Sequence, residues 1–167
     1  MRYDFKAMLA RGEAAERALD SFFAGRFDIT NPSRQSEGID RVFAPRNGGR
    51  SFTVEYKTDW TAVKTHNAFI ETVSVDKAEI QGWAHTSKAE WLIYYIPEPE
   101  SVAYAIKFAR LRDQLGRWIS GYPHRTVSNE KNKSRYNTIG VLVPLDEMEA
   151  VSKSVLDLSV IDGQVIR

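Results

Sequence analysis

Three charged residues lie close together on a predicted β-hairpin. Asp40 begins the stretch D-R-V-F, and Glu55 and Lys57 belong to V-E-Y-K, which follows the turn-forming residues R-N-G-G. Side chains alternate between the two faces of a strand, so Glu55 and Lys57 point the same way. Antiparallel pairing of a strand over 39–43 with one over 51–58 then brings Asp40 toward them.

Two kinds of chemistry fit this arrangement. Two converging carboxylates form a hard, oxygen-rich site suited to Mg²⁺ or Mn²⁺, completed by backbone carbonyls and waters. Lys57 would then orient or deprotonate a water, or stabilise negative charge that develops on a phosphate. The alternative is a set of ion pairs at an exposed sheet end, each contributing about 0–1 kcal/mol. The spacing alone leaves both open.

A third carboxylate is expected on an N-terminal helix over residues 3–26. Glu16 falls in the middle of its apolar face, which is formed by Phe5, Leu9, Leu19 and Phe23. A carboxylate buried among such side chains is costly unless it meets a cation or a metal-bound water. The alternative is a glutamate at the edge of the apolar face that reaches solvent.

The remaining pattern predicts elements that frame the hairpin. The apolar run W-L-I-Y-Y-I predicts a central strand over 91–96. We further expect strands over 68–75, 101–107 and 136–143, helices over 76–87, 107–120 and 144–155, and a loop over 121–135. This order predicts a single α/β domain over 1–167, with a mixed central sheet flanked by helices. Its αβββαβ core spans about 5–107, and an α/β appendage spans about 108–167.

The stretches G-E-A-A-E-R-A-L, G-I-D and V-E-Y-K, in this order of elements, resemble the PD-(D/E)XK nuclease superfamily over roughly residues 5–107. The likeness is to its junction-resolvase or phage-type branch. It implies that Asp40, Glu55 and Lys57 are the catalytic motif and that Glu16 is the helix glutamate of such members. It also implies Mg²⁺ or Mn²⁺ held by Asp40, Glu55 and the carbonyl of Tyr56, with Glu16 binding a second metal or its waters. Ile39 stands where the name-giving proline would be, a position that varies widely in the superfamily.

Two further residues are candidates for the same site. Glu71 lies on the expected third strand, from which it would approach the site, although an exposed strand residue is the alternative. Gln81 lies on the expected helix over 76–87, where some members of the superfamily carry a glutamine that contacts the metal water or DNA. Surface helices also carry glutamine for no special reason.

Positive charge is concentrated in one segment. Residues 107–135 hold eight Lys or Arg and two Asp or Glu, while the whole chain has a net charge of +1. This predicts contacts with the DNA backbone; the alternative is a solvated helix face and a mobile loop. The candidate DNA-binding residues are Lys107, Arg110, Arg117, Arg125, Lys131, Lys133 and Arg135.

Composition removes several other classes of function. The chain has no cysteine, so disulfides and thiolate chemistry are excluded. It contains neither G-x-S-x-G nor G-K-[ST], the motifs of triad hydrolases and P-loop proteins. The lack of a long apolar run or a signal-peptide pattern predicts a cytoplasmic protein without a membrane anchor.

The sequence therefore predicts a Mg²⁺-dependent DNA endonuclease that is structure-directed or non-specific. Such an enzyme would act in replication, recombination or repair, or in phage or mobile-element biology. Cutting both strands is compatible with a homodimer. The alternatives are an inactive nucleic-acid-binding or assembly module on the same fold, and a sequence-specific restriction endonuclease.

Overall fold

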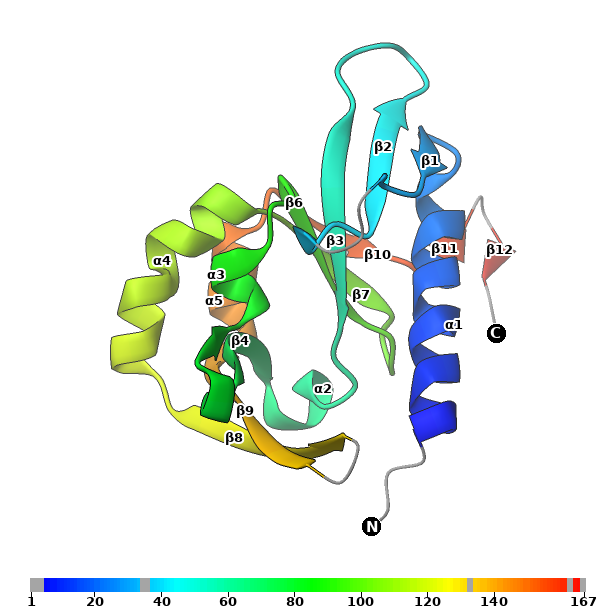
Figure 1. Ribbon diagram of the computed structural model, residues 1–167. Coiled ribbons are helices and arrows are strands. Elements are labelled where there is room, and N and C mark those ends of the chain that lie inside the picture. The colour runs from blue at the N-terminus through cyan, green and yellow to red at the C-terminus, as the bar shows by residue number, and fades with distance from the viewer. Residues whose placement is uncertain (1–4, 34–36, 132–133, 162–163, 166–167) are drawn as a thin grey trace.

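Two β-sheets organise the chain in the computed structural model, which describes residues 5–33, 37–131, 134–161 and 164–165 (Figure 1). The main sheet has the strand order β1-β2-β3-β6-β7-β10, and the smaller sheet has the order β5-β4-β9-β8. The main sheet contains β1 (Phe27–Thr30), β2 (Arg41–Pro45), β3 (Phe52–Thr58), β6 (Trp91–Ile96), β7 (Val102–Lys107) and β10 (Ser154–Asp157). The smaller sheet contains β4 (Asn67–Val75), β5 (Ile80–Gln81), β8 (His124–Lys131) and β9 (Ser134–Pro144). Strands β11 (Val160–Ile161) and β12 (Gln164–Val165) pair with each other.

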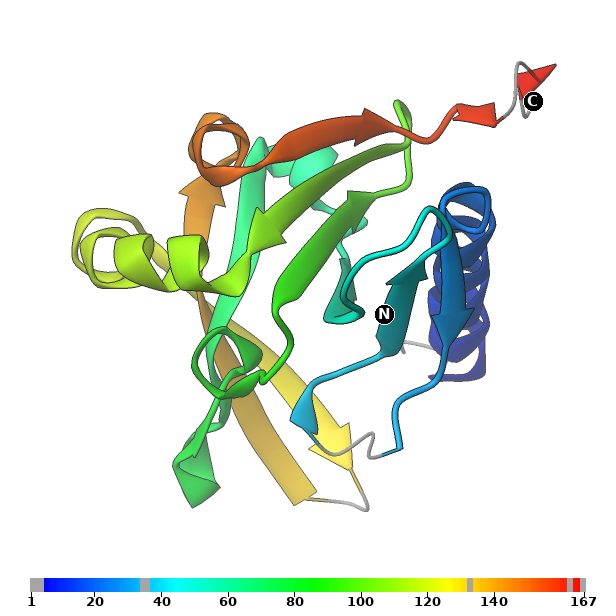
Figure 2. The same ribbon diagram turned by 90° about the horizontal axis from the view of Figure 1, so that it is seen from above.

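Helices cover both faces of the main sheet (Figure 2). Helix α1 (Phe5–Phe23) lies on one face, and α3 (Trp83–Thr86), α4 (Phe108–Gly121) and α5 (Leu145–Val151) lie on the other with the smaller sheet. The short α2 (Ala62–Thr65) and a 3₁₀ turn (Asp76–Ala78) flank β4 along the chain. The predicted α/β class, with a mixed sheet between helices in a single domain, is confirmed.

Strand β6 separates the two hydrophobic cores. It runs parallel to β3 and antiparallel to β7, so the main sheet is mixed. Its Ile93 and Tyr95 pack toward α1, whereas Leu92 and Tyr94 pack toward α4 and α5. The central strand predicted from W-L-I-Y-Y-I is therefore confirmed by burial on both faces.

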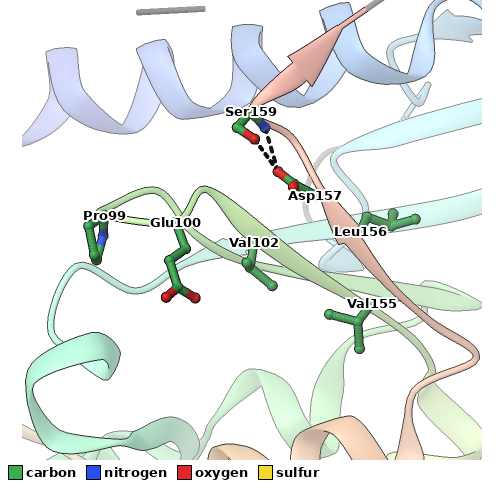
Figure 3. Close-up of a pocket in the computed structure, with 7 residues that line it drawn as sticks. All are labelled: Pro99, Glu100, Val102, Val155, Leu156, Asp157 and Ser159. Atoms are coloured by element: carbon green, nitrogen blue, oxygen red, sulfur yellow. Dashed lines mark hydrogen bonds between the residues drawn. The ribbon is translucent and has the colours of Figure 1, made fainter. Parts of the chain in front are cut away.

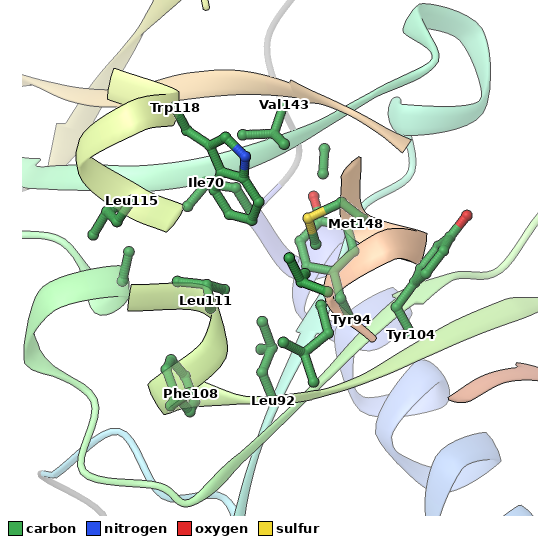
Figure 4. Packing of buried hydrophobic residues seen from close by; sticks show 14 of the residues in the cluster. Ile70, Leu92, Tyr94, Tyr104, Phe108, Leu111, Leu115, Trp118, Val143 and Met148 are labelled. Carbon is green, nitrogen blue, oxygen red and sulfur yellow. The ribbon is translucent and has the colours of Figure 1, made fainter. Parts of the chain in front are cut away.

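The larger core lies between the main sheet, the smaller sheet and α4 (Figure 4). The apolar side chains of α4 that are buried there are Phe108, Leu111, Leu115 and Trp118. Val143 of β9 and Met148 of α5 complete the same core. The chain after Lys107 thus contributes to this core, and β10 adds an edge strand to the main sheet.

The helix predicted over 76–87 is wrong. A 3₁₀ turn, strand β5 and the short α3 occupy this segment. Glu79 ends the turn with a φ of 52°, and Ile80 is 50% exposed. Gly82 then approaches β4 so closely that a Cβ there would lie 2.4 Å from the Glu71 carbonyl oxygen. Its amide donates to the Thr72 carbonyl of β4 (2.8 Å) and not to a preceding helical turn.

The loop predicted over 121–135 is also wrong. Strand β8 pairs along its full length with β9, from His124 opposite Val141 to Lys131 opposite Ser134. Its polar composition follows from its position at the edge of the smaller sheet, where most of its side chains are exposed. The three-stranded meander of the main sheet is β1-β2-β3; the expected third strand, β4, belongs to the smaller sheet.

A buried polar network joins the two sheets. Asp59 follows β3 and accepts hydrogen bonds from the amides of Thr61 and Ala62 (2.8 and 2.9 Å) and from the hydroxyl of Tyr94 (2.6 Å). The Tyr94 oxygen in turn accepts the Phe69 amide of β4 (2.9 Å). Each buried group in this network therefore has a partner.

Replacing Tyr94 by Phe is expected to lower the free energy of unfolding by about 1–3 kcal/mol, because the Phe69 amide and the Asp59 carboxylate each lose a partner. Tyr95→Phe is the matched control, since Tyr95 is also buried but its hydroxyl meets only Ser101 (3.0 Å) near the surface. Urea denaturation measures both changes. Equal losses in the two variants would contradict the role of the network.

Candidate functional site

Strand pairing places Asp40 and Glu55 side by side. Arg41 lies opposite Val54 in the β2–β3 ladder, so the preceding Asp40 lies opposite Glu55. The ladder ends at this point: the Asp40 amide donates to the Val54 carbonyl (2.9 Å), and the Asp40 carboxylate accepts the Tyr56 amide (2.7 Å). The structure thus brings these two carboxylates to neighbouring positions, as the sequence predicts.

The Glu55 carboxylate is buried and incompletely paired. The residue is 2% exposed, and its Oε1 lies 2.6 Å from Nζ of Lys57. Its Oε2 has no hydrogen-bond partner among the described residues. Burial raises the pKa of Glu55, and the Lys57 charge opposes that rise. The nearby Ser87 hydroxyl donates to the Gly38 carbonyl (2.7 Å), and a hydrogen bond from Ser87 also counteracts the rise in the Glu55 pKa.

Lys57 stands between two carboxylates. Its side chain is 33% exposed, and its ammonium lies 5.8 Å from the centre of the Trp83 ring. The Lys57 charge also acts on Glu71 of β4: burial raises the pKa of Glu71, and the Lys57 charge counteracts this. A Cβ at Gly82 would lie 2.7 Å from the Glu71 side chain, so the glycine leaves room for it. The expected strand carries Glu71, but this strand belongs to the smaller sheet and not to the sheet of the hairpin.

Glu16 is not brought to this site. The Glu16 side chain is 42% exposed and pairs with Arg41 (3.0 Å), so the expected burial in an apolar face is wrong. Leu9, also expected on that face, is 53% exposed. Val54 and Tyr56 pack toward α1, so Glu55 and Lys57 project from the opposite face of the sheet. The main sheet therefore lies between Glu16 and Glu55.

Gln81 lies at the end of β5 and is exposed. The helix that would have presented it to the site is absent from this described segment. No hydrogen bond joins it to Asp40 or Glu55 within the described part of the chain. The expectation that placed Gln81 on a helix is therefore wrong.

Asp40 and Glu55 place two carboxylates at neighbouring positions, and carboxylate oxygens are the ligands that hard divalent cations prefer. Within residues 5–33, 37–131, 134–161 and 164–165, no group of three or more His, Asp or Glu is arranged to hold a metal ion. Mg²⁺, however, is commonly bound through only one or two carboxylates together with waters and substrate phosphates. Asp40 and Glu55, with the unpartnered Oε2 of Glu55, provide such a pair. The Tyr56 carbonyl lies on the same edge of β3 as its amide, which bonds Asp40.

The cationic candidates divide into paired and exposed residues. Arg117 forms an ion pair with Glu147, and the same carboxylate accepts from Trp118 Nε1 (3.1 Å) and the Tyr122 hydroxyl (2.8 Å). Arg135 lies 3.7 Å from Glu130. Arg117 and Arg135 are therefore partly neutralised within the fold.

The other candidates differ in surroundings. Lys107 is exposed at the end of β7, with its ammonium 5.5 Å from the Trp91 ring. Arg110 on α4 and Arg125 on β8 are exposed. Lys131 ends β8, and Lys133 lies outside the described residues. Helix α4, which carries Arg110, covers the face of the main sheet that carries Glu55. Lys107 lies opposite Trp91 in the sheet, and Trp91 packs on the α1 face, so Lys107 belongs to the face opposite Glu55.

Sequence reasoning missed Asp20 and Arg41. Arg41 donates to both Asp20 oxygens (3.1 Å each), and Tyr56 donates its hydroxyl to the same carboxylate (2.9 Å). A signal was present: Asp20 lies four residues after Glu16, so both face the same side of α1. Arg41 begins β2 directly after Asp40. Its side chain therefore points to the opposite face, toward α1.

A separate shallow pocket lies where β10 meets the β6–β7 connection (Figure 3). Glu100 and Asp157 provide its carboxylates, and Asp157 accepts the Ser159 amide (2.9 Å). Val102 and Val155 contribute apolar surface. The pocket shares no residue with the site around Glu55.

Replacing Lys57 by Met is expected to lower the free energy of unfolding by about 1–3 kcal/mol, because it leaves the buried Glu55 carboxylate without its counter-charge. Glu55→Gln alone is expected to change stability less, and the double variant should recover most of the loss. Urea denaturation of all four proteins measures the coupling. Additive losses would show that the pair has no such role.

Glu147 should govern part of the acid sensitivity. Hydrogen bonds from Arg117, then Trp118 and Tyr122, lower its pKa from 4.5 to about 2. A lowered folded-state pKa contributes stability that is present above pH 4.5 and lost as the pH falls toward 2. Thermal unfolding of Glu147→Gln should therefore depend less on pH in this window. Glu149→Gln, an exposed residue on the same helix, should keep the parental slope.

No family model, curated protein or solved structure matches the chain. Among the described residues, no helix combines the length and apolar character needed to cross a bilayer. The chemistry of the site must therefore be inferred from its own geometry.

Proposed function

We propose that this protein is a divalent-metal-dependent DNA endonuclease. The observation that carries the proposal is the buried Glu55 carboxylate, which has one unpartnered oxygen, lies opposite Asp40 and pairs with Lys57 at 2.6 Å. Keeping a carboxylate at 2% exposure is unfavourable unless a cation compensates it, and Lys57 contacts only one of its oxygens. An incompletely satisfied buried charge next to a second carboxylate is typical of a functional site.

The residues would divide the work as follows. Asp40, Glu55 and the Tyr56 carbonyl would hold Mg²⁺ or Mn²⁺, whose chemistry is to polarise a phosphate and make a bound water more acidic. Lys57 would orient the attacking water or offset charge that develops on the phosphate. Glu71 would fix the position of Lys57 from the other side.

DNA is the substrate that the charge distribution supports. Arg110 is exposed on α4, which covers the face of the main sheet that carries Glu55, and Arg125 is exposed on β8. Lys107 is exposed on the opposite face, beside Trp91. No base-reading motif accompanies them in the sequence, so we expect these residues to contact phosphates. We further expect cleavage that is directed by DNA structure or has no sequence specificity. Repair, recombination or phage biology would be suitable settings, and two copies would allow both strands to be cut.

One observation favours a second candidate, a non-catalytic DNA-binding module. Asp40 accepts the Tyr56 amide and Lys57 neutralises Glu55, so part of the cluster already serves the fold. The two functions differ in whether Mg²⁺ changes the covalent state of DNA.

A cleavage panel tests the proposal. Duplex, single-stranded, flap and junction DNA are incubated with Mg²⁺, Mn²⁺ or EDTA. We expect metal-dependent cleavage that falls by about 100-fold or more in Asp40→Asn, Glu55→Gln and Lys57→Met. Glu90→Gln is the control, because this carboxylate pairs with Arg50 away from Glu55. Unchanged cleavage in all three site variants, or DNA binding without cleavage by the parent, would contradict the nuclease.

A further inference from the structure

An ion cluster lies on the face of the main sheet opposite Glu55. Arg41 donates from Nε to both oxygens of Asp20 (3.1 Å each) and from Nη2 to Glu16 and Asp20 (3.0 Å each). Tyr56 donates its hydroxyl to Asp20 (2.9 Å), and its ring lies 5.6 Å from the Arg41 guanidinium. The cluster therefore connects α1 to both strands of the hairpin.

The same arginine holds the main chain at Asp40. Nη1 of Arg41 donates to the Asp40 carbonyl (2.8 Å), so the guanidinium bridges that carbonyl and two carboxylates of α1. On the other strand, Tyr56 stands between Glu55 and Lys57 in sequence, and its amide bonds the Asp40 carboxylate (2.7 Å). Asp40 and Glu55, whose carboxylates are proposed to bind the metal, are thus each adjacent in sequence to a residue of this cluster. Tyr56, whose carbonyl is proposed to bind it, belongs to the cluster itself.

The physical character of the cluster suits a rigid support. The Arg41 side chain is 16% exposed, and a guanidinium presents its donors in a fixed planar fork. Other contacts fix the chain just before Asp40, because Ile39 is buried and the Gly38 carbonyl accepts the Ser87 hydroxyl (2.7 Å), whereas Arg41 fixes it from the α1 side.

We propose that Asp20 and Arg41 are positioning residues, which act from the α1 face to set the Asp40 carboxylate against Glu55 on the opposite face. This inference rests on the proposed function. Glu16 belongs to the same support through its ion pair with Arg41. Metal sites of this kind lose affinity when the residues that orient their ligands are removed.

Two measurements on Arg41→Gln test the proposal, with Arg46→Gln as the matched control. Arg46 also joins a main-chain carbonyl (Ala24, 2.9 Å) and a carboxylate (Asp28, 2.8 Å), but it lies beyond the other end of β2. Calorimetric titration with Mn²⁺ should show affinity roughly 10–100-fold weaker in Arg41→Gln and unchanged in Arg46→Gln. Asp20→Asn should weaken binding in the same direction, and Arg41→Lys should not restore it.

Amide hydrogen exchange provides a readout that needs no metal. The Tyr56 amide bonds the Asp40 carboxylate, so Arg41→Gln should speed its exchange at least about tenfold while amides of β6 stay protected. If exchange at Tyr56 and Mn²⁺ affinity match the Arg46→Gln control, the positioning role is wrong. If Tyr56 exchange changes but the parent protein binds no Mn²⁺, the support is real and the proposed metal-dependent function fails. Asp20→Asn serves both measurements if Arg41→Gln does not fold.

Discussion

Burial of the Glu55 carboxylate is the constraint on which the rest of the site depends. Strand β3 is covered on both faces, so a charged side chain in its middle must find compensation inside the protein. Lys57 supplies a cation for one oxygen only. A fold selected for stability alone would favour an apolar residue at this position, because replacing buried ion pairs by apolar side chains is often neutral or stabilising.

The alternation of β3 assigns two different tasks to neighbouring residues. Glu55 and Lys57 face the smaller sheet, where Glu71 and Trp83 complete their surroundings. Tyr56 faces α1 and reaches Asp20. The central strand β6 repeats this division, because its two faces belong to separate cores. The site therefore lies on one side of the main sheet, and the ion cluster that supports it lies on the other.

Local patterns predicted what depends on local chemistry. The spacing of Asp40, Glu55 and Lys57 with R-N-G-G between the strands predicted their convergence, and the apolar run over 91–96 predicted the central strand. Glu16 was misjudged because helical periodicity cannot reveal that Arg41 lies beside it. The helix expected over 76–87 failed because the close approach of Gly82 to Glu71 is a tertiary contact. Strand β8 was missed because polar edge strands resemble loops in sequence.

The proposed function requires that Asp40 and Glu55 share a divalent cation. Anomalous diffraction from crystals soaked in Mn²⁺ tests it most directly, since the ion is located independently of activity. We expect an anomalous peak for Mn²⁺ within bonding distance of both carboxylates and the Tyr56 carbonyl, with Lys57 displaced from Glu55 toward Glu71. Crystals that show no peak at this position, and an intact Glu55–Lys57 pair at high Mn²⁺ concentration, would contradict it.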